Sequence, residues 1–236
     1  MSDYLILWPQ LTKGTLIRRY KRFMADVELE NGHVITVHCP NSGRMLGCSE
    51  PGRTVFLSQS DNKNRKFPYT WEIIHMPGSL VVVNTLRANQ AAKAAIERGL
   101  IPELTGYSAI RSEVRIGEHS RIDLLLERDH GRSTLVEVKS ATYAIDGLVM
   151  FPDAVTARGL KHLKELQRSL TRGYRCVMFF LVQRMDAHFF TPADHIDPAY
   201  AQGLHMARSK GVEVIVYGTE ITHEGMALGP RIPCRF

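Results

Sequence analysis

The pattern of hydrophobic residues changes near residue 84, and this change limits the possible folds more than any other feature of the 236-residue chain. Before it, short segments of alternating apolar and polar residues are separated by polar turns, and no segment has the spacing of an amphipathic helix. After it, helical and strand-like segments alternate. The sequence therefore predicts a small all-β domain, residues 1–84, followed by a mixed α/β domain, residues 85–236.

The first domain contains one clear hairpin signal. Residues 23–29 alternate apolar and polar side chains, Asn31 and Gly32 follow, and the β pattern resumes directly after them. Asn-Gly between two such segments predicts a type I′ turn, because both residues tolerate a positive φ. Two further strand-like segments, residues 54–58 and 69–75, make the set typical of a small sandwich or barrel. We expect a five-stranded OB-like barrel, because it fits the length of the domain.

Helices and strands alternate in the second domain. The helix predicted over residues 153–172 is the strongest, because its leucines recur every three or four residues and a glycine follows it. A helix-turn-helix at the C-terminus is an alternative, but the period-two pattern of residues 212–217 favours a strand. The expected order is α-β-β-β-α-β, extended by a further helix and strand. Helices are expected at residues 89–99, 153–172 and 197–210, and strands at 109–116, 121–127, 133–141, 174–183 and 212–217.

Charge and cysteine content narrow the class of protein. The net charge is +6 and the isoelectric point is near 9.2, which is compatible with a nucleic-acid partner but also with many enzymes. The apolar segment at residues 177–182 is far shorter than the ~20 residues of a membrane span, so we expect no membrane partner. The N-terminus has no basic stretch followed by an apolar one, and no cysteines are closely spaced. These features favour a cytoplasmic protein without a zinc or disulfide motif.

Two basic segments are candidates for nucleic-acid binding. The stretch from Lys13 to Arg22 has five basic residues, no acidic one, and an aromatic ring at Tyr20. Cations neutralise phosphates and aromatic faces stack on bases, a mixture that suits a single strand. The helix at residues 153–172 carries a second basic stripe, and an ordinary solvated surface is the alternative for both segments. The candidates are Arg18, Arg19, Tyr20, Lys21 and Arg22 in the first segment and Arg158, Lys161 and Lys164 in the second.

Two neighbouring strands carry charged residues inside aliphatic segments. Asp123 and, on the next strand, Glu137 and Lys139 are each flanked by Ile, Leu or Val. Residues two apart share one face of a strand, so Glu137 and Lys139 point to the same side. If the strands pair symmetrically about His130, opposed residue numbers sum to 260, which sets Asp123 directly opposite Glu137. A single-residue bulge would break this register.

This pair of carboxylates predicts a metal site. Opposed carboxylates repel each other unless a proton or a cation lies between them. We expect Mg²⁺ or Mn²⁺, with oxygen ligands from Asp123, Glu137, water and a substrate phosphate. Lys139 is expected to position an attacking water or to stabilise charge that develops on the phosphoryl group. The alternative is a surface Glu–Lys pair with Asp123 in a turn.

The same residues carry a resemblance to known proteins. An acid, a hairpin and a Glu-x-Lys strand resemble the PD-(D/E)xK nuclease superfamily, with Asp123, Glu137 and Lys139 in the motif positions. Ile122 stands where the superfamily label has proline, which supplies no metal ligand. More closely, the chain resembles the sugar fermentation stimulation protein A family over essentially its full length. The segments that carry this resemblance are residues 39–45, 95–104, 135–140, 151–159 and 162–163.

The resemblance implies an OB-like domain followed by a nuclease-like domain, DNA binding, and a link to the regulation of sugar-utilisation genes. It also implies that Glu97 matches a helix acid that many superfamily members add to the catalytic metal site. An exposed helix glutamate is the alternative for Glu97. His162, Asn41 and Arg44 lie in the matching segments and join the candidates for nucleic-acid binding.

The sequence therefore predicts a mixed α/β protein that binds DNA largely without sequence preference and cleaves phosphodiester bonds with Mg²⁺ or Mn²⁺. A DNA-binding regulator of sugar (maltose-type) utilisation genes, whose nuclease-like fold does not cut, is the first alternative. An RNA-directed nuclease is the second, because the basic and aromatic segment does not distinguish RNA from single-stranded DNA.

Overall fold

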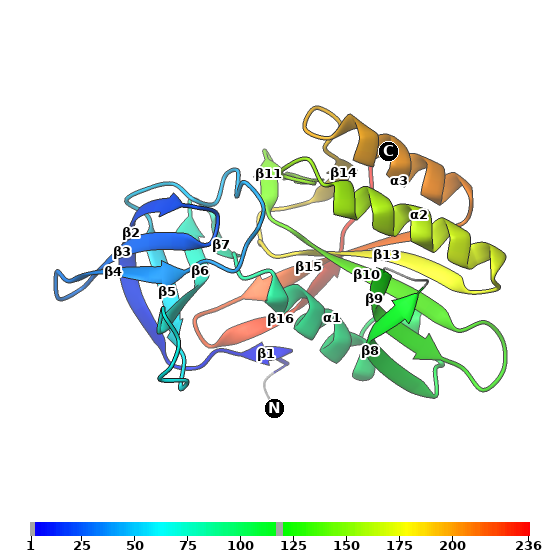
Figure 1. Cartoon of the computed structure of the whole chain (residues 1–236), viewed down its shortest axis with the longest axis horizontal. Helices are drawn as coiled ribbons and strands as arrows, with labels where there is room; N and C mark the ends of the chain where they lie inside the picture. Colours follow the sequence, from blue (N-terminus) through cyan, green and yellow to red (C-terminus); the bar gives the residue numbers. More distant parts are fainter. Residues whose placement is uncertain (1–2, 117–119) are drawn as a thin grey trace.

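The computed structural model describes residues 3–116 and 120–236 of the chain. An all-β barrel lies at one end of the molecule, and a seven-stranded mixed sheet with helices on both faces forms the rest (Figure 1). The predicted fold class, a mixed α/β protein with an N-terminal OB-like barrel and a nuclease-like second domain, is confirmed. No helix in the described part of the chain is long and apolar enough to cross a membrane.

The first domain is a closed barrel, so the sandwich alternative is wrong. Its strands lie in the order β4-β3-β2-β5-β6-β7, and a pairing between His38 and Thr70 joins β4 to β6. Leu16, Trp71 and Ile74 are fully buried inside the barrel. Its strands are β2 (Leu11–Tyr20), β3 (Met24–Leu29), β4 (Val34–His38), β5 (Thr54–Gln59), β6 (Tyr69–Met76) and β7 (Ser79–Val82).

The predicted hairpin exists, but its turn type differs from the prediction. Leu29 donates a backbone hydrogen bond to the carbonyl of His33, and Gly32 donates one to the carbonyl of Leu29. Of Asn31 and Gly32, only Gly32 has a positive φ, of 79°. The connection is therefore a three-residue loop, Glu30 to Gly32, that ends in a left-handed glycine, rather than a two-residue type I′ turn.

The second domain has one central sheet between two apolar layers. The strand order is β1-β16-β15-β13-β10-β9-β8. Helix α1 packs on one face with Val136 and Val138, whereas α2 and α3 pack on the other face with Leu135 (Figure 1). The strands are β1 (Ile6–Leu7), β8 (Ala109–Ile116), β9 (Ser120–Glu127), β10 (Thr134–Ala141), β13 (Arg175–Val182), β15 (Glu213–Ile221) and β16 (Gly225–Arg231). The helices are α1 (Leu86–Glu97), the short 3₁₀ helix η1 (Pro102–Leu104), α2 (Ala157–Thr171) and α3 (Pro198–Ser209).

The C-terminal strand Glu213–Ile221 confirms the strand predicted over residues 212–217, so the helix-turn-helix alternative is wrong. Other elements depart from the sequence prediction. Helix α2 begins at Ala157 instead of residue 153, and the Thr156 side chain caps it by accepting a hydrogen bond from the Gly159 nitrogen. A small third sheet was not predicted, and it consists of β11 (Tyr143–Ile145), β12 (Leu148–Phe151) and β14 (Phe189–Pro192).

The N-terminal strand crosses the proposed division at residue 84. β1 pairs antiparallel with β16, and the side chains of Leu5, Ile6 and Trp8 join the apolar cluster around α1. Residues 5–8 thus pack with the second domain although they precede the barrel in the chain.

Candidate nucleic-acid and metal site

Asp123 lies where the pairing between β9 and β10 ends. The observed pairs, from Leu126 with Thr134 to Leu124 with Val136, all sum to 260, as the symmetric hairpin predicts. Asp123 and Glu137 would form the next pair, but the ladder stops before them. Instead, the Asp123 Oδ2 accepts a hydrogen bond of 2.7 Å from the Val138 nitrogen. The two carboxylates are therefore neighbours at a point where the strands separate, and not a ladder pair.

The Asp123 carboxyl has an unusual protonation equilibrium. Burial and the negative charge of Glu137 raise its pKa to about 6, although the Lys139 charge and hydrogen bonds from Val138 and Asn89 oppose this change. The Asn89 amide donates to Asp123 Oδ1 at 2.9 Å. The sequence predicted that this helix begins at residue 89, but Thr85 is its N-cap residue and Asn89 lies inside α1.

Glu137 is buried beneath two cationic or potentially cationic groups. Its side chain is 1% exposed, and its Oε1 contacts both the His162 Nδ1 and the Lys139 Nζ. Burial raises the pKa of Glu137, but the hydrogen bond from His162 and the Lys139 charge outweigh it, so the pKa lies below its usual value. Arg158 donates from Nε to the His162 Nε2 at 3.4 Å. The second oxygen of Glu137, Oε2, is buried and has no hydrogen-bond partner.

The donor set at this point fits a hard divalent cation. A buried carboxylate oxygen without a donor is costly unless a cation completes it. Glu137 Oε2 and the Asp123 carboxylate offer the oxygen ligands that Mg²⁺ and Mn²⁺ prefer, and such ions fill their remaining positions with backbone, water and substrate oxygens. Within residues 3–116 and 120–236, no group of three His, Cys, Asp or Glu side chains is arranged to hold a metal ion.

Glu97 does not join these two carboxylates. It forms an ion pair with Lys93, one turn earlier in α1, and its side chain is 42% exposed. The residue of α1 that contacts Asp123 is Asn89, two turns before Glu97 and about 12 Å away along the helix axis. In the structure Glu97 is therefore an exposed helix glutamate with a cationic partner, which is the alternative that the sequence analysis gave to a metal ligand.

Arg18 and Tyr20 lie together on the outer surface of the barrel. Arg18 pairs with Asp26 at 2.9 Å and lies 5.0 Å from the centre of the Tyr20 ring, and the Tyr20 hydroxyl also donates to Asp26. The Arg18 side chain nevertheless remains 67% exposed. Lys21 and Arg22, which follow in the turn to β3, are exposed as well.

Arg19 and Asn41 are engaged inside the protein. The Arg19 Nη2 donates to the carbonyls of Asn41 at 2.8 Å and Gly43 at 2.9 Å. The buried Asn41 amide donates to the Val83 carbonyl at 3.0 Å, and its Oδ1 accepts from the Gly43 nitrogen. These contacts hold both side chains on the loop around residues 41–44. Arg44, in the same loop, is exposed.

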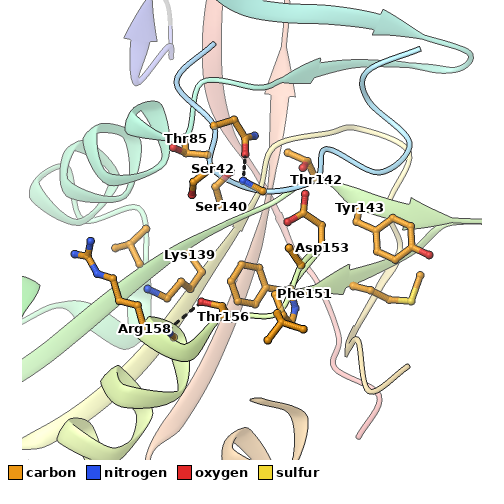
Figure 2. Close-up of a pocket in the computed structure, with 18 of the residues that line it drawn as sticks. Ser42, Thr85, Lys139, Ser140, Thr142, Tyr143, Phe151, Asp153, Thr156 and Arg158 are labelled. Carbon is orange, nitrogen blue, oxygen red and sulfur yellow. Dashed lines mark hydrogen bonds between the residues drawn. The ribbon is translucent and has the colours of Figure 1, made fainter. Parts of the chain in front are cut away.

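This loop and the second domain line a pocket of about 480 Å³ beside Lys139 (Figure 2). Lys139 and Arg158 line it from the second domain, whereas Arg22 and Ser42 line it from the barrel. A second pocket, of about 450 Å³, lies on the other side of Arg158. Its lining is Glu113, Arg115, Ser120, Arg121, Arg158, Lys161 and His162. The predicted residue Lys164 is exposed and lines neither pocket.

Two arginines that the sequence analysis did not select, Arg115 and Arg121, line the second pocket. They lie directly opposite each other on β8 and β9. Like charges in directly opposed positions destabilise a sheet, so the pair has an energetic penalty in the free protein. This pair could have been predicted from the sequence, because antiparallel pairing of the strands predicted at residues 109–116 and 121–127 sets the two arginines opposite each other.

Comparisons with known proteins agree with this architecture. Residues 17–83 match the family described as the SfsA N-terminal OB domain, and residues 86–225 match the one described as the sugar fermentation stimulation protein RE domain. A sugar fermentation stimulation protein homolog of Geotalea uraniireducens is 49% identical over 225 residues, covering 95% of this chain and 97% of that protein. The homolog of Geobacter sulfurreducens is 50% identical over 229 residues, covering 97% and 98%.

A solved structure extends the likeness to three dimensions. The structure described as Pyrococcus furiosus SfsA in complex with Ca²⁺ is 27% identical, covers 100% of both chains and has a TM-score of 0.91. The matched families together span most of the chain, and the relatives match nearly all of it. This chain therefore belongs to the sugar fermentation stimulation protein family, SfsA.

Proposed function

We propose that this protein binds DNA largely without sequence preference and cleaves phosphodiester bonds with Mg²⁺ or Mn²⁺ at Asp123 and Glu137. The observation that carries the proposal is the buried Glu137 Oε2, which has no partner and lies in a site that also contains Asp123 and Lys139. A protein that only binds DNA has no use for two neighbouring carboxylates at its binding site, because they repel phosphate. The Ca²⁺ in the Pyrococcus furiosus relative supports a divalent-metal site here.

The proposed roles follow from the contacts of each side chain. Asp123 and Glu137 would hold the divalent ion, which when bound neutralises phosphoryl charge and lowers the pKa of a bound water. Lys139 has no lone pair and is not a ligand, so it would position water or stabilise phosphoryl charge. His162 holds the orientation of Glu137 through Oε1 and leaves Oε2 available.

Two basic surfaces would bind the phosphates on either side of this centre. The second pocket supplies Arg115, Arg121, Arg158 and Lys161. The barrel supplies Arg18, Lys21, Arg22 and Arg44, with Tyr20 available to stack on a base. Arg19 and Asn41 would act indirectly, because they shape the loop at residues 41–44. The free thiols of Cys39, Cys48, Cys176 and Cys234 support our proposal of a reducing cytoplasm.

One observation favours the second candidate, a DNA-binding regulator of sugar-utilisation genes that does not cut. Glu97 turns to Lys93, and only two carboxylates meet at the site among the described residues. A site with fewer acidic ligands binds a divalent ion more weakly, and a nuclease-like fold with such a site is suited to binding alone.

Incubation of the purified protein with single-stranded, double-stranded and branched DNA and with RNA separates these candidates. We expect cleavage with Mg²⁺ or Mn²⁺, none in EDTA, and none by Glu137→Gln. Lys139→Ala should lower the cleavage rate by about 10²–10³, whereas DNA affinity should change by no more than the loss of one phosphate contact would cause. If the wild-type protein binds DNA but cleaves none of these substrates with either metal, the result supports the regulator. If it cleaves RNA alone, the protein is an RNA-directed nuclease.

A further inference from the structure

The pocket beside Lys139 has walls from both domains, although each domain has its own apolar core. The loop at residues 41–43 forms one wall, and the segment from Phe151 to Gly159 forms another. In Figure 2, Lys139 and Arg158 reach into one side of this space, and Ser42 and Thr85 lie at another. A ligand in this pocket would therefore contact the barrel and the catalytic domain at the same time.

The turn between β2 and β3 brings one cation, Arg22, to this pocket, and the backbone of this turn is strained. Lys21 and Arg22 have φ values of 48° and 63°, and both lie in the left-handed region that side chains other than glycine rarely adopt. Such outliers persist where the surrounding structure enforces them and are concentrated at functional sites. Arg22 lines the pocket, and its side chain has no hydrogen-bond or ion-pair partner among the described residues. Lys21 does not line it.

The lining of the pocket combines apolar side chains with polar groups. Phe151 and the exposed Val155 supply apolar surface, and Val155 is 74% exposed. The Ser42 hydroxyl has no hydrogen-bond partner among the described residues, so it is available to a ligand. A nucleobase needs this combination, since its faces stack on apolar groups and its edges form hydrogen bonds.

The wall that carries Ser42 is held rigidly. Asp153 Oδ2 accepts a hydrogen bond of 2.7 Å from the Met45 nitrogen. Gly43 approaches the same carboxylate so closely that a Cβ there would lie 2.3 Å from Asp153 Oδ1. Together with the Arg19 contacts to the loop, these interactions fix the position of this wall.

We infer that this pocket accepts one nucleotide of a single strand, with the base against Phe151 and Ser42 and the phosphate between Arg22, Lys139 and Arg158. The inference rests on the proposed function, since it names single-stranded DNA as the substrate class of that site. A volume of about 480 Å³ is sufficient for a single nucleotide. A base in a duplex enters only after it leaves the stack, which has an energetic penalty that a single strand avoids.

Fluorescence anisotropy of the full-length protein in EDTA tests this inference without cleavage. The probes are a labelled oligothymidine, a duplex of the same length, and a strand of that length with abasic sites. We expect the wild type to bind oligothymidine most tightly at a given salt concentration. Arg22→Ala should weaken oligothymidine binding about tenfold and duplex binding by less than about threefold.

Lys21→Ala is the matched control, because it removes the same charge from the same turn outside the pocket. It should weaken binding of both probes by a similar factor and leave their ratio unchanged. Ser42→Trp should fill the pocket and remove the advantage of oligothymidine over the abasic strand. If Ser42→Trp does not fold, Val155→Asp replaces it in the experiment, because Val155 is exposed. The added negative charge should weaken oligothymidine binding by repulsion of the phosphates.

Equal wild-type affinity for oligothymidine and the abasic strand would overturn the inference. The inference is also overturned if Arg22→Ala and Lys21→Ala change the ratio of oligothymidine affinity to duplex affinity equally. If the pocket variants behave as expected but no metal gives cleavage, only the nuclease proposal fails. If the protein cleaves a duplex and shows no preference for a single strand, only the pocket assignment fails.

Discussion

The Asp123 carboxylate takes the place of a strand partner for the Val138 backbone nitrogen, which donates to it at 2.7 Å. This single contact ends the β9–β10 ladder and keeps a carboxylate beside the buried Glu137. The sheet thus opens at the point where the two acids meet. Because repulsion between these acids is built into the folded state, the stability of the metal-free protein should depend on the Asp123 charge.

We predict that Asp123→Asn stabilises the metal-free protein at neutral pH. The pKa of Asp123 is raised from an unfolded value near 3.8 to about 6, so its contribution to stability is present below pH 3.8 and is lost as the pH rises through about 6. Removing the charge should recover up to about 3 kcal/mol above pH 7, less any loss from altered hydrogen bonds. Urea unfolding in EDTA at several pH values measures this, with the exposed Asp129→Asn as control. A gain of equal size at pH 3.5 would contradict the electrostatic cause.

A second prediction concerns the response to Mn²⁺. An ion that binds only the folded protein stabilises it by about 2.7 kcal/mol at a hundred times its dissociation constant. Thermal unfolding of the wild type should therefore shift upward with Mn²⁺, and the shift should disappear in Asp123→Asn and Glu137→Gln. Glu97→Gln should keep the whole shift, because Glu97 pairs with Lys93 away from the site. Loss of the shift in Glu97→Gln would restore Glu97 as a metal ligand.

The opposed arginines predict effects of opposite sign on stability and binding. Because Arg115 and Arg121 face each other on β8 and β9, Arg121→Ala should stabilise the free protein by a few tenths of a kcal/mol. The same variant should weaken DNA binding and lower the salt slope by roughly 1. Arg111→Ala, on the neighbouring strand β8 and paired with Glu127, is the control and should leave the slope unchanged. Unchanged DNA binding by Arg121→Ala would remove this pair from the phosphate surface.

The contact between Gly43 and Asp153 predicts a strong effect of one methyl group. Gly43→Ala would bring a Cβ within 2.3 Å of the Asp153 carboxylate, so we expect a loss of about 1–3 kcal/mol. If the clash is the cause, adding Asp153→Ala should recover part of the loss, and the two substitutions should be non-additive. Chemical unfolding of the two single variants and the double variant measures the coupling. Simple additivity would show that Gly43 is needed for another reason.

Much of the fold could be predicted from the sequence because it depends on local periodicity. Period-two and helical patterns located the barrel strands β3 to β6, α2 and β15, and the symmetric hairpin predicted the register from Leu126 with Thr134 to Leu124 with Val136. Charges inside aliphatic strands also indicated Asp123, Glu137 and Lys139, because burial of such groups requires a partner. These signals come from neighbouring residues, and the strand geometry that relates them is fixed.

Contacts between residues far apart in the chain were decided by the tertiary structure. The same chemistry made Arg19 and Arg22 equal candidates, yet the barrel turns Arg19 onto the carbonyls of residues 41–43 and leaves Arg22 at the pocket. Likewise, helix packing set Asn89 against Asp123 and left Glu97 with Lys93. Which side of a strand or helix meets a distant element depends on the relative placement of whole layers, a property that no local pattern encodes. The sequence alone thus determined the types of chemical group available, and packing of the barrel against the sheet decided which of them share a site.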